Sequence, residues 1–177
     1  MFSTKSLRRI LLALATSGCL VAGGLDVFAQ GLPGLTIFSG VERENILNYR
    51  LDFGGTPGSF DRYRLRIPAK KMVEGASKFI ISYPEYYDGK FDVDNIEVRI
   101  DGDALPLQEV VWDQESQLVE IDLEEPITES RKVELVFSNV KNPRHGGTYY
   151  FNAEVLAATD VPIRLYLGTW IVSIGRG

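Results

Sequence analysis

One segment of the sequence carries more distinctive side-chain chemistry than a connector between strands needs. Residues 83–94 read Tyr-Pro-Glu-Tyr-Tyr-Asp-Gly-Lys-Phe-Asp-Val-Asp. Tyrosine offers a large amphipathic surface at low conformational cost, which suits contact with a protein or a sugar. The segment therefore predicts a partner-binding loop that uses Tyr83, Glu85, Tyr86, Tyr87 and Phe91. The alternative interpretation is that Tyr86, Tyr87 and Phe91 cap one end of the hydrophobic core.

The same segment holds three carboxylates that could bind calcium. Asp88, Asp92 and Asp94 are hard oxygen ligands of the kind that calcium prefers. Their spacing differs from an EF-hand loop, because Ile96 and Glu97 stand where that loop needs Asp or Asn followed by Gly. Turn-forming aspartates ahead of a strand explain the same residues. Both interpretations stay open at this level.

Residues that could catalyse a reaction are scattered along the chain. Glycoside hydrolysis needs one protonated and one ionised carboxyl a few ångströms apart. His145 lies in a turn composition, Ser138 and Ser173 lack a nucleophile elbow, and Gly54–Gly58 lacks the Lys-Ser/Thr end of a phosphate loop. No enzyme activity and no cofactor are therefore predicted. The carboxylates that sequence spacing does not bring together are Asp113, Glu115, Glu124 and Glu125.

Residues 1–29 have the pattern of an export signal. Basic residues precede an apolar run at 10–20, and a small-residue cleavage motif ends at Ala29. The apolar run is too short and too broken by glycine to span a bilayer, so no stable membrane span is expected after cleavage. Two alternatives are a lipoprotein signal acylated at Cys19 and an uncleaved anchor.

The chain from Gln30 onward would then have no cysteine and one histidine, which excludes disulfides, thiolate zinc sites and a cysteine nucleophile. It would carry 16 basic and 23 acidic residues, or −7, and no clustered basic run. Such a chain is poorly suited to nucleic acid. Its length suits one domain, predicted over residues 35–177 after a short segment at 30–34.

Short runs of alternating apolar and polar residues fill that domain, and such alternation buries one face of a strand. The clearest predicted strands are 63–67, 78–83, 96–100, 118–123 and 133–137. Further strands are predicted at 35–38, 48–53, 149–156 and 163–174, the last bulged near Gly168. The expected total is eight to ten strands.

Turn residues separate these runs at regular intervals. Asp101-Gly102 is the best hairpin signal, and residues 68–75 could form a single helical turn. The spacing predicts an all-β fold, an antiparallel two-sheet sandwich of the immunoglobulin-like kind. The apolar run at 165–174 is either a strand buried on both faces or an edge strand that docks onto a partner.

Several segments together resemble the DUF2808 family of exported cyanobacterial proteins. The resemblance implies a cyanobacterial source and an envelope or extracellular location, but it carries over no catalytic or binding residues. It spans the chain after the leader, and the segments are 35–41, 47–55, 61–68, 149–152 and 167–171.

These observations lead to one expected function and one alternative. The expected function is a non-catalytic exported module that contacts a cell-envelope protein or polysaccharide through aromatic loops or an edge strand. The alternative is a periplasmic protein that binds calcium or a small ligand through Asp88, Asp92 and Asp94.

Overall fold

The computed structural model describes residues 40–159 and 161–175, which form eleven strands and three short 3₁₀ helices. The predicted all-β, immunoglobulin-like sandwich of two sheets is confirmed. The predicted leader and the predicted strand at 35–38 lie outside the described residues. Within the described part, no helix is long and apolar enough to cross a membrane.

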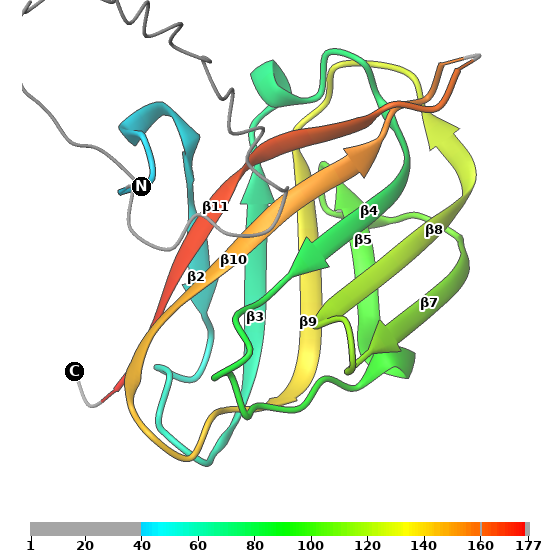
Figure 1. Cartoon of the computed structure of the whole chain (residues 1–177). Coiled ribbons are helices and arrows are strands. Elements are labelled where there is room, and N and C mark those ends of the chain that lie inside the picture. The colour runs from blue at the N-terminus through cyan, green and yellow to red at the C-terminus, as the bar shows by residue number, and fades with distance from the viewer. Residues whose placement is uncertain (1–39, 160, 176–177) are drawn as a thin grey trace, which may run out of the picture. The chain divides into compact units, whose positions relative to one another are not determined.

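The strands form two sheets that face each other across the core (Figure 1). The first sheet has the order β1 (Ile46–Leu47), β11 (Arg164–Ile174), β10 (Gly147–Leu156), β4 (Ala76–Ser82), β8 (Leu118–Ile127) and β7 (Leu107–Asp113). The second has the order β2 (Tyr49–Leu51), β3 (Phe60–Ile67), β9 (Val133–Lys141), β5 (Ile96–Ile100) and β6 (Asp103–Ala104). The 3₁₀ helices are η1 (Arg43–Asn45), η2 (Ala69–Lys71) and η3 (Val93–Asn95).

Alternation along each strand determines which face it buries. In β3, Tyr63, Leu65 and Ile67 are fully buried, while the arginines between them face outward. Opposite them, Trp170 of β11 is fully buried and its indole N–H donates to the carbonyl of Arg66 at 3.2 Å. Apolar residues of both inner faces thus make one continuous core.

The predicted strands agree with the structure wherever alternation is regular. All five of the clearest predictions lie on strands, the Asp101-Gly102 hairpin joins β5 to β6, and η2 is the predicted helical turn. The strand β7 was not predicted. A register shift between Leu107 and Glu109 interrupts its alternation, so the sequence there does not show a period of two.

The strand predicted at 48–53 is present as β2, although β2 is shorter than predicted, and the two-residue strand β1 just before it was not predicted. The chain forms β1, passes Asn48, and continues as β2 in the other sheet. Because β1 pairs in parallel with β11, the sandwich is also not antiparallel throughout. A strand of two residues is too short to show an alternating pattern, which explains why β1 was not predicted.

The strand β11 is flanked by β10 on one side and by β1 on the other, so the edge-strand interpretation is wrong where β1 covers it, at Thr169 and Trp170. Leu167 to Trp170 are all buried. The bulge predicted near Gly168 is confirmed, because Gly168 pairs with Ala153 whereas the next paired residue is Tyr166.

Replacing Gly168 with alanine is expected to lower the free energy of unfolding by about 1–3 kcal/mol. Gly168 has φ +148°, and an added Cβ would lie 2.5 Å from the carbonyl oxygen of Asn45 and 2.8 Å from Cγ of Leu47. Urea unfolding of Gly168→Ala measures the loss. Gly102→Ala is the control, since Gly102 has φ +102° but no atom within 4 Å of the added Cβ. Equal losses in both variants would mean that the approach of β1 contributes nothing.

Candidate functional site

Four connections meet at one end of the sandwich, at the bottom of the view in Figure 1, and we call this the loop end. Backbone hydrogen bonds link them: Gly58 donates to the carbonyl of Pro143 at 2.8 Å, and Tyr83 donates to that of Gln117 at 3.1 Å. The predicted contact segment at 83–94 is therefore held among other loops. The four connections are 52–59, 83–95, 114–117 and 142–146.

Asp61 holds the first of these loops in place. Its buried carboxylate accepts the backbone N–H groups of Phe53 at 2.9 Å, Gly55 at 2.7 Å and Arg62 at 2.7 Å. Three N–H dipoles replace the water that the buried charge has lost. Gly54–Gly58 is thus a loop organised by a neighbouring aspartate, a role that the sequence did not indicate.

Three of the five predicted contact residues belong to the core. Tyr83 is 8% exposed, Tyr87 5% and Phe91 7%, and all three are part of the core cluster. Tyr87 stacks on Phe91 with ring centroids 5.4 Å apart and meets Phe151 edge-on at 5.0 Å. Hence the prediction that all five residues contact a partner needs correction, because buried rings offer no surface. Glu85 and Tyr86 remain, both exposed, with Tyr86 at 63%.

The polar atoms of the packed aromatic side chains form hydrogen bonds. The Tyr63 hydroxyl donates to Oδ1 of Asn142 at 2.6 Å, and the Trp112 indole N–H donates to the Tyr83 hydroxyl at 2.7 Å. Burial is the largest cause of a raised pKa at four tyrosines, Tyr63, Tyr83, Tyr87 and Tyr149. The loop end is thus closed inward by a rigid, hydrogen-bonded aromatic layer.

These raised pKa values predict a loss of stability in alkali. Below the ordinary tyrosine pKa of 10.0 the hydroxyls are protonated in both the folded and the unfolded chain, so the free energy of unfolding keeps its full value. Above it the unfolded chain ionises first, so the free energy of unfolding falls as pH rises toward the folded-state pKa values. Urea unfolding at several alkaline pH values, with tyrosinate absorbance followed in parallel, measures this. Tyr87→Phe should flatten the decline, and equal stability on both sides of pH 10 would contradict it.

The three aspartates proposed as calcium ligands are engaged separately. Oδ2 of Asp92 accepts from Nδ2 of Asn139 at 2.7 Å, and this bond is the largest cause of the lowered pKa of Asp92. Oδ1 of Asp88 accepts the backbone N–H of Arg144 at 3.1 Å, while Asp94 is exposed in η3. Among the described residues, no group of three or more His, Cys, Asp or Glu side chains is placed to hold a metal ion.

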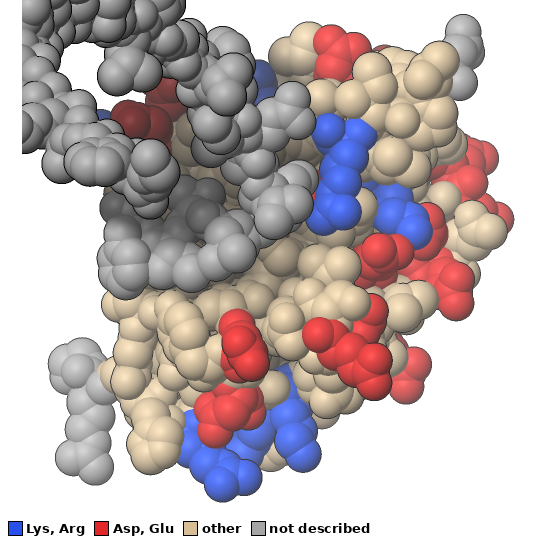
Figure 2. All heavy atoms as spheres, viewed as in Figure 1, with Lys and Arg blue, Asp and Glu red and all other residues tan. Residues whose placement is uncertain are grey.

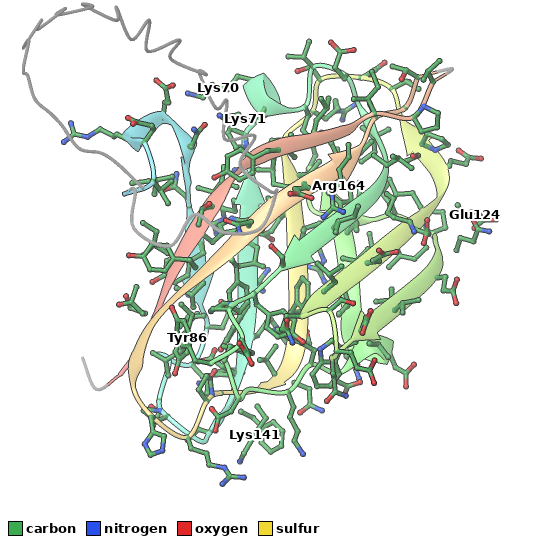
Figure 3. All side chains as sticks on the ribbon, viewed as in Figure 1. Lys70, Lys71, Tyr86, Glu124, Lys141 and Arg164 are labelled. Carbon is green, nitrogen blue, oxygen red and sulfur yellow. The ribbon has the colours of Figure 1, made fainter. Side chains whose placement is uncertain are left out.

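Two of the carboxylates considered for hydrolysis, Asp113 and Glu124, lie respectively in a hydrogen-bonded turn and at the solvent-exposed surface. Oδ1 of Asp113 accepts the backbone N–H groups of Glu115 at 2.9 Å and Ser116 at 3.1 Å. The pKa of Asp113 is lowered, first by hydrogen bonding to the Ser116 side chain and then by these backbone N–H groups. Glu124 is exposed farther along β8 and points into solvent (Figure 3). His145 is exposed in the 142–146 connection, as predicted.

A shallow groove of about 470 Å³ lies beside the 83–95 connection. Backbone pairing builds one wall, because Phe60 of β3 lies opposite Lys141 of β9, and Lys141 lies opposite Lys90. Lys90 and Lys141 exchange both N–H···O bonds at 2.8 Å. The groove is lined by Phe60, Asp88, Lys90, Phe91, Asp92, Asn139, Lys141, Asn142 and Arg144.

Directly opposite residues on paired strands project to the same side, so Phe60, Lys141 and Lys90 form a row, which we call the Phe60–Lys141–Lys90 row. Phe60 is 57% exposed, and Nζ of Lys141 lies 4.7 Å from its ring centroid. Basic side chains gather at this lower end in Figure 2, where Figure 3 labels Lys141. Sequence reasoning missed the row, because nothing in the sequence brings residues from three separate segments together.

A second, smaller hollow of about 190 Å³ also borders this connection, and its lining includes Tyr83, Glu85, Trp112 and Gln114. Asp88 and Lys90 line both hollows. The predicted contact segment thus contributes residues to two concave surfaces. The arrangement can bind a ligand by aromatic contact, hydrogen bonds and charge.

Comparison with solved structures finds β-sandwich proteins of low sequence identity. The bacterial hydrophobin BslA has a TM-score of 0.50 and 16% identity, with 77% of this chain and 97% of that chain covered. The collagen-binding domain from a Staphylococcus aureus adhesin has a TM-score of 0.40 and 10% identity, covering 78% and 100%. An uncharacterized protein from Nocardia farcinica with an immunoglobulin-like fold has 0.42 and 8%, covering 73% and 98%. These likenesses concern the fold alone.

Comparison with curated proteins gives no match. The family model DUF2808, a protein of unknown function, matches residues 35–174. That range contains every described strand and all four connections of the loop end. The chain therefore belongs to the DUF2808 family of proteins of unknown function.

Proposed function

We propose that this protein is a non-catalytic, exported module that binds a polysaccharide of the cell envelope through its loop end. The observation that carries the proposal is the exposure of Phe53, Phe60 and Tyr86 at that end, while the neighbouring rings pack into the core. Exposed aromatic side chains beside a concave surface are suited to stacking against the apolar face of a sugar ring. Export is supported by the leader pattern at 1–29.

The polar lining of the groove favours a polysaccharide over a protein as the partner. Amide and charged groups such as Asn139, Lys141 and Asp92 surround one exposed ring, and hydroxyl-rich ligands need such donors and acceptors. A stable protein interface usually buries roughly 800 Å² on each partner around a core depleted of charge. The loop end instead mixes single rings with ionised side chains.

Co-sedimentation of the protein, expressed from its full-length sequence, with insoluble envelope material from its own cells tests the proposal. Binding should survive protease treatment of the envelope and should be lost after periodate oxidation of its sugars. Phe60→Ala should weaken binding at least about fivefold, because the ring would supply part of the contact. Val73→Ala is the matched control, since Val73 is equally exposed but follows η2 at the opposite end.

Three results would contradict the proposal. The first is no sedimentation with the envelope material. The second is binding that protease treatment abolishes, which would point to a protein partner instead. The third is equal weakening by Phe60→Ala and Val73→Ala, which would separate binding from the loop end.

A further inference from the structure

We infer that the groove at the loop end is selective for an acidic polysaccharide, with Lys90 and Lys141 holding its carboxylate or sulfate groups and Phe60 stacking on a sugar ring. The inference rests on the proposed function and adds the charge of the ligand and the residues that recognise it. Three features support it, namely a like-charge pair of lysines, the pairing of the nearby carboxylates with residues other than these lysines, and the neighbouring aromatic ring.

The first feature is the placement of two lysines directly opposite each other. Because Lys90 and Lys141 exchange both backbone hydrogen bonds, their Cα atoms lie about 5.5 Å apart and their side chains share a face. Like charges in such a position repel and destabilise the pair. Among the described residues, neither Nζ lies within 4.0 Å of a carboxylate oxygen. An anion between the two ammonium groups would remove the repulsion.

Other basic residues on the strands, such as Arg66 and Lys78, have carboxylate partners. Nε of Arg66 lies 2.9 Å from Glu134, and Nζ of Lys78 lies 2.7 Å from Glu120. Cross-strand carboxylates thus neutralise these cations within the sheets. Arg50 and Arg64 also lie directly opposite each other, but Asp52 is 3.3 Å from Nε of Arg50 and 2.9 Å from Nε of Arg64. Lys90 and Lys141 differ from that pair because, in the described part of the chain, no carboxylate bridges their ammonium groups.

The second feature is that both acidic groups of the groove are hydrogen-bonded to lining residues other than the two lysines. Asp92 accepts from Asn139, and Asp88 accepts from the backbone of Arg144, whose Nε lies 3.8 Å from the same carboxylate. Arg144 therefore already has a carboxylate, whereas the lysines do not. The groove lining holds three basic and two acidic side chains, in a chain whose formal charge is −5.

The third feature is the aromatic ring beside the charges. Nζ of Lys141 lies 4.7 Å from the Phe60 centroid, so an exposed apolar surface and an ammonium group are adjacent. A small inorganic anion would leave the ring unused. An acidic sugar presents both an apolar ring face and a charged group, and it would engage both.

Equilibrium binding of the full-length-expressed protein to chemically modified envelope polysaccharide tests the inference. The probes are the intact polymer, the polymer after reduction of its carboxylates to alcohols, and the desulfated polymer. Polygalacturonate, neutral dextran and poly(dT) are added as defined probes. Removing the recognised anion should weaken binding at least about tenfold, since hydrogen bonds to charged groups are stronger than those between neutral groups. Loss on reduction assigns carboxylate, and loss on desulfation assigns sulfate.

The matched variants compare the loop end with the opposite end of the sandwich. Lys90→Gln with Lys141→Gln should weaken binding to the intact polymer at least about tenfold and flatten its salt dependence. Lys70→Gln with Lys132→Gln removes the same charge at the opposite end, near η2 and the start of β9, and should change affinity less than about twofold. Circular dichroism checks that each variant is folded, and the single variants Lys90→Gln and Lys141→Gln should each lose part of the affinity.

Failure of the inference can be told apart from failure of the proposed function. If reduced and desulfated polymer binds as well as the intact polymer while Phe60→Ala still weakens binding, the acidic ligand is wrong and the proposed function stands. Equal effects of the two double variants, or equal affinity for poly(dT), would also overturn the inference. If no envelope polysaccharide binds, both are wrong.

Discussion

Tyr87→Ala is expected to lower the free energy of unfolding by about 3–5 kcal/mol, whereas Tyr86→Ala should cost less than about 0.5 kcal/mol. The two residues are neighbours in sequence, but Tyr87 is 5% exposed and Tyr86 is 63% exposed. Truncating Tyr87 would leave a cavity among Phe91, Tyr149 and Phe151, whose rings lie 5.0–5.4 Å from its own. Truncating Tyr86 would remove one ring contact, at 5.7 Å from Tyr149, near solvent.

Urea unfolding followed by far-ultraviolet circular dichroism measures both losses on one scale. Similar losses in the two variants would contradict the placement of Tyr87 in the core. The contrast also decides how the contact segment should be tested. A binding defect in Tyr87→Ala would report partial unfolding, so Tyr86→Ala is the variant that can report a contact.

Asp61→Ala is the second large effect, with an expected loss of about 3–4 kcal/mol. The carboxylate accepts three backbone N–H groups, from Phe53, Gly55 and Arg62, and the bond to Gly55 is fully buried. Each buried donor left without a partner costs about 1–3 kcal/mol, and water can satisfy only the two that are part-buried. Asp61→Asn should lose less, about 1–2 kcal/mol, because one carbonyl acceptor remains.

Hydrogen exchange of the Gly55 amide measures the local effect, and urea unfolding measures the global one. Asp103→Asn is the control, since Asp103 is exposed in β6. If Asp61→Ala unfolds at the same urea concentration as Asp103→Asn, the 52–59 connection does not depend on this carboxylate. Loss of the loop should also weaken envelope binding, because Phe53 lies in it and Phe60 directly follows it.

The fall in the free energy of unfolding at alkaline pH and the loss of stability in Gly168→Ala test other parts of the same fold. The former concerns the aromatic layer under the loop end, and the latter concerns the approach of β1 to the bulge in β11. Neither touches the groove lysines. These two stability predictions can therefore hold or fail independently of the binding proposals.

The strands that sequence alone predicted are those whose inner and outer faces alternate without interruption. In β3 and β5 every second residue points into the core, and the local pattern carries the complete signal. The prediction missed β7, where a bulge alters the period, and β1, which has only two residues before the chain changes sheet. Such features depend on which neighbouring strand the chain meets, and no local pattern records that.

The contact segment at 83–94 was recognised from composition, but composition could not separate its buried rings from its exposed ones. Tyr83, Tyr87 and Phe91 are buried because β10, β9 and β7 supply Phe151, Phe137 and Trp112 against them. Those partners lie 21 to 68 residues away in the sequence. Burial of an aromatic side chain is decided by what packs on it, whereas the residue type only makes burial favourable.

By itself the sequence determined the all-β class, the best hairpin, the helical turn at η2 and the bulge at Gly168, because these follow from local periodicity and from the backbone freedom of glycine. Only the tertiary structure decided that Phe60, Lys141 and Lys90 form one row and that Asp61 organises the 52–59 connection. The physical reason is that charge and hydrogen-bonding chemistry act over a few ångströms in space. Strand pairing, which brings distant segments within that range, is settled by packing of the whole core.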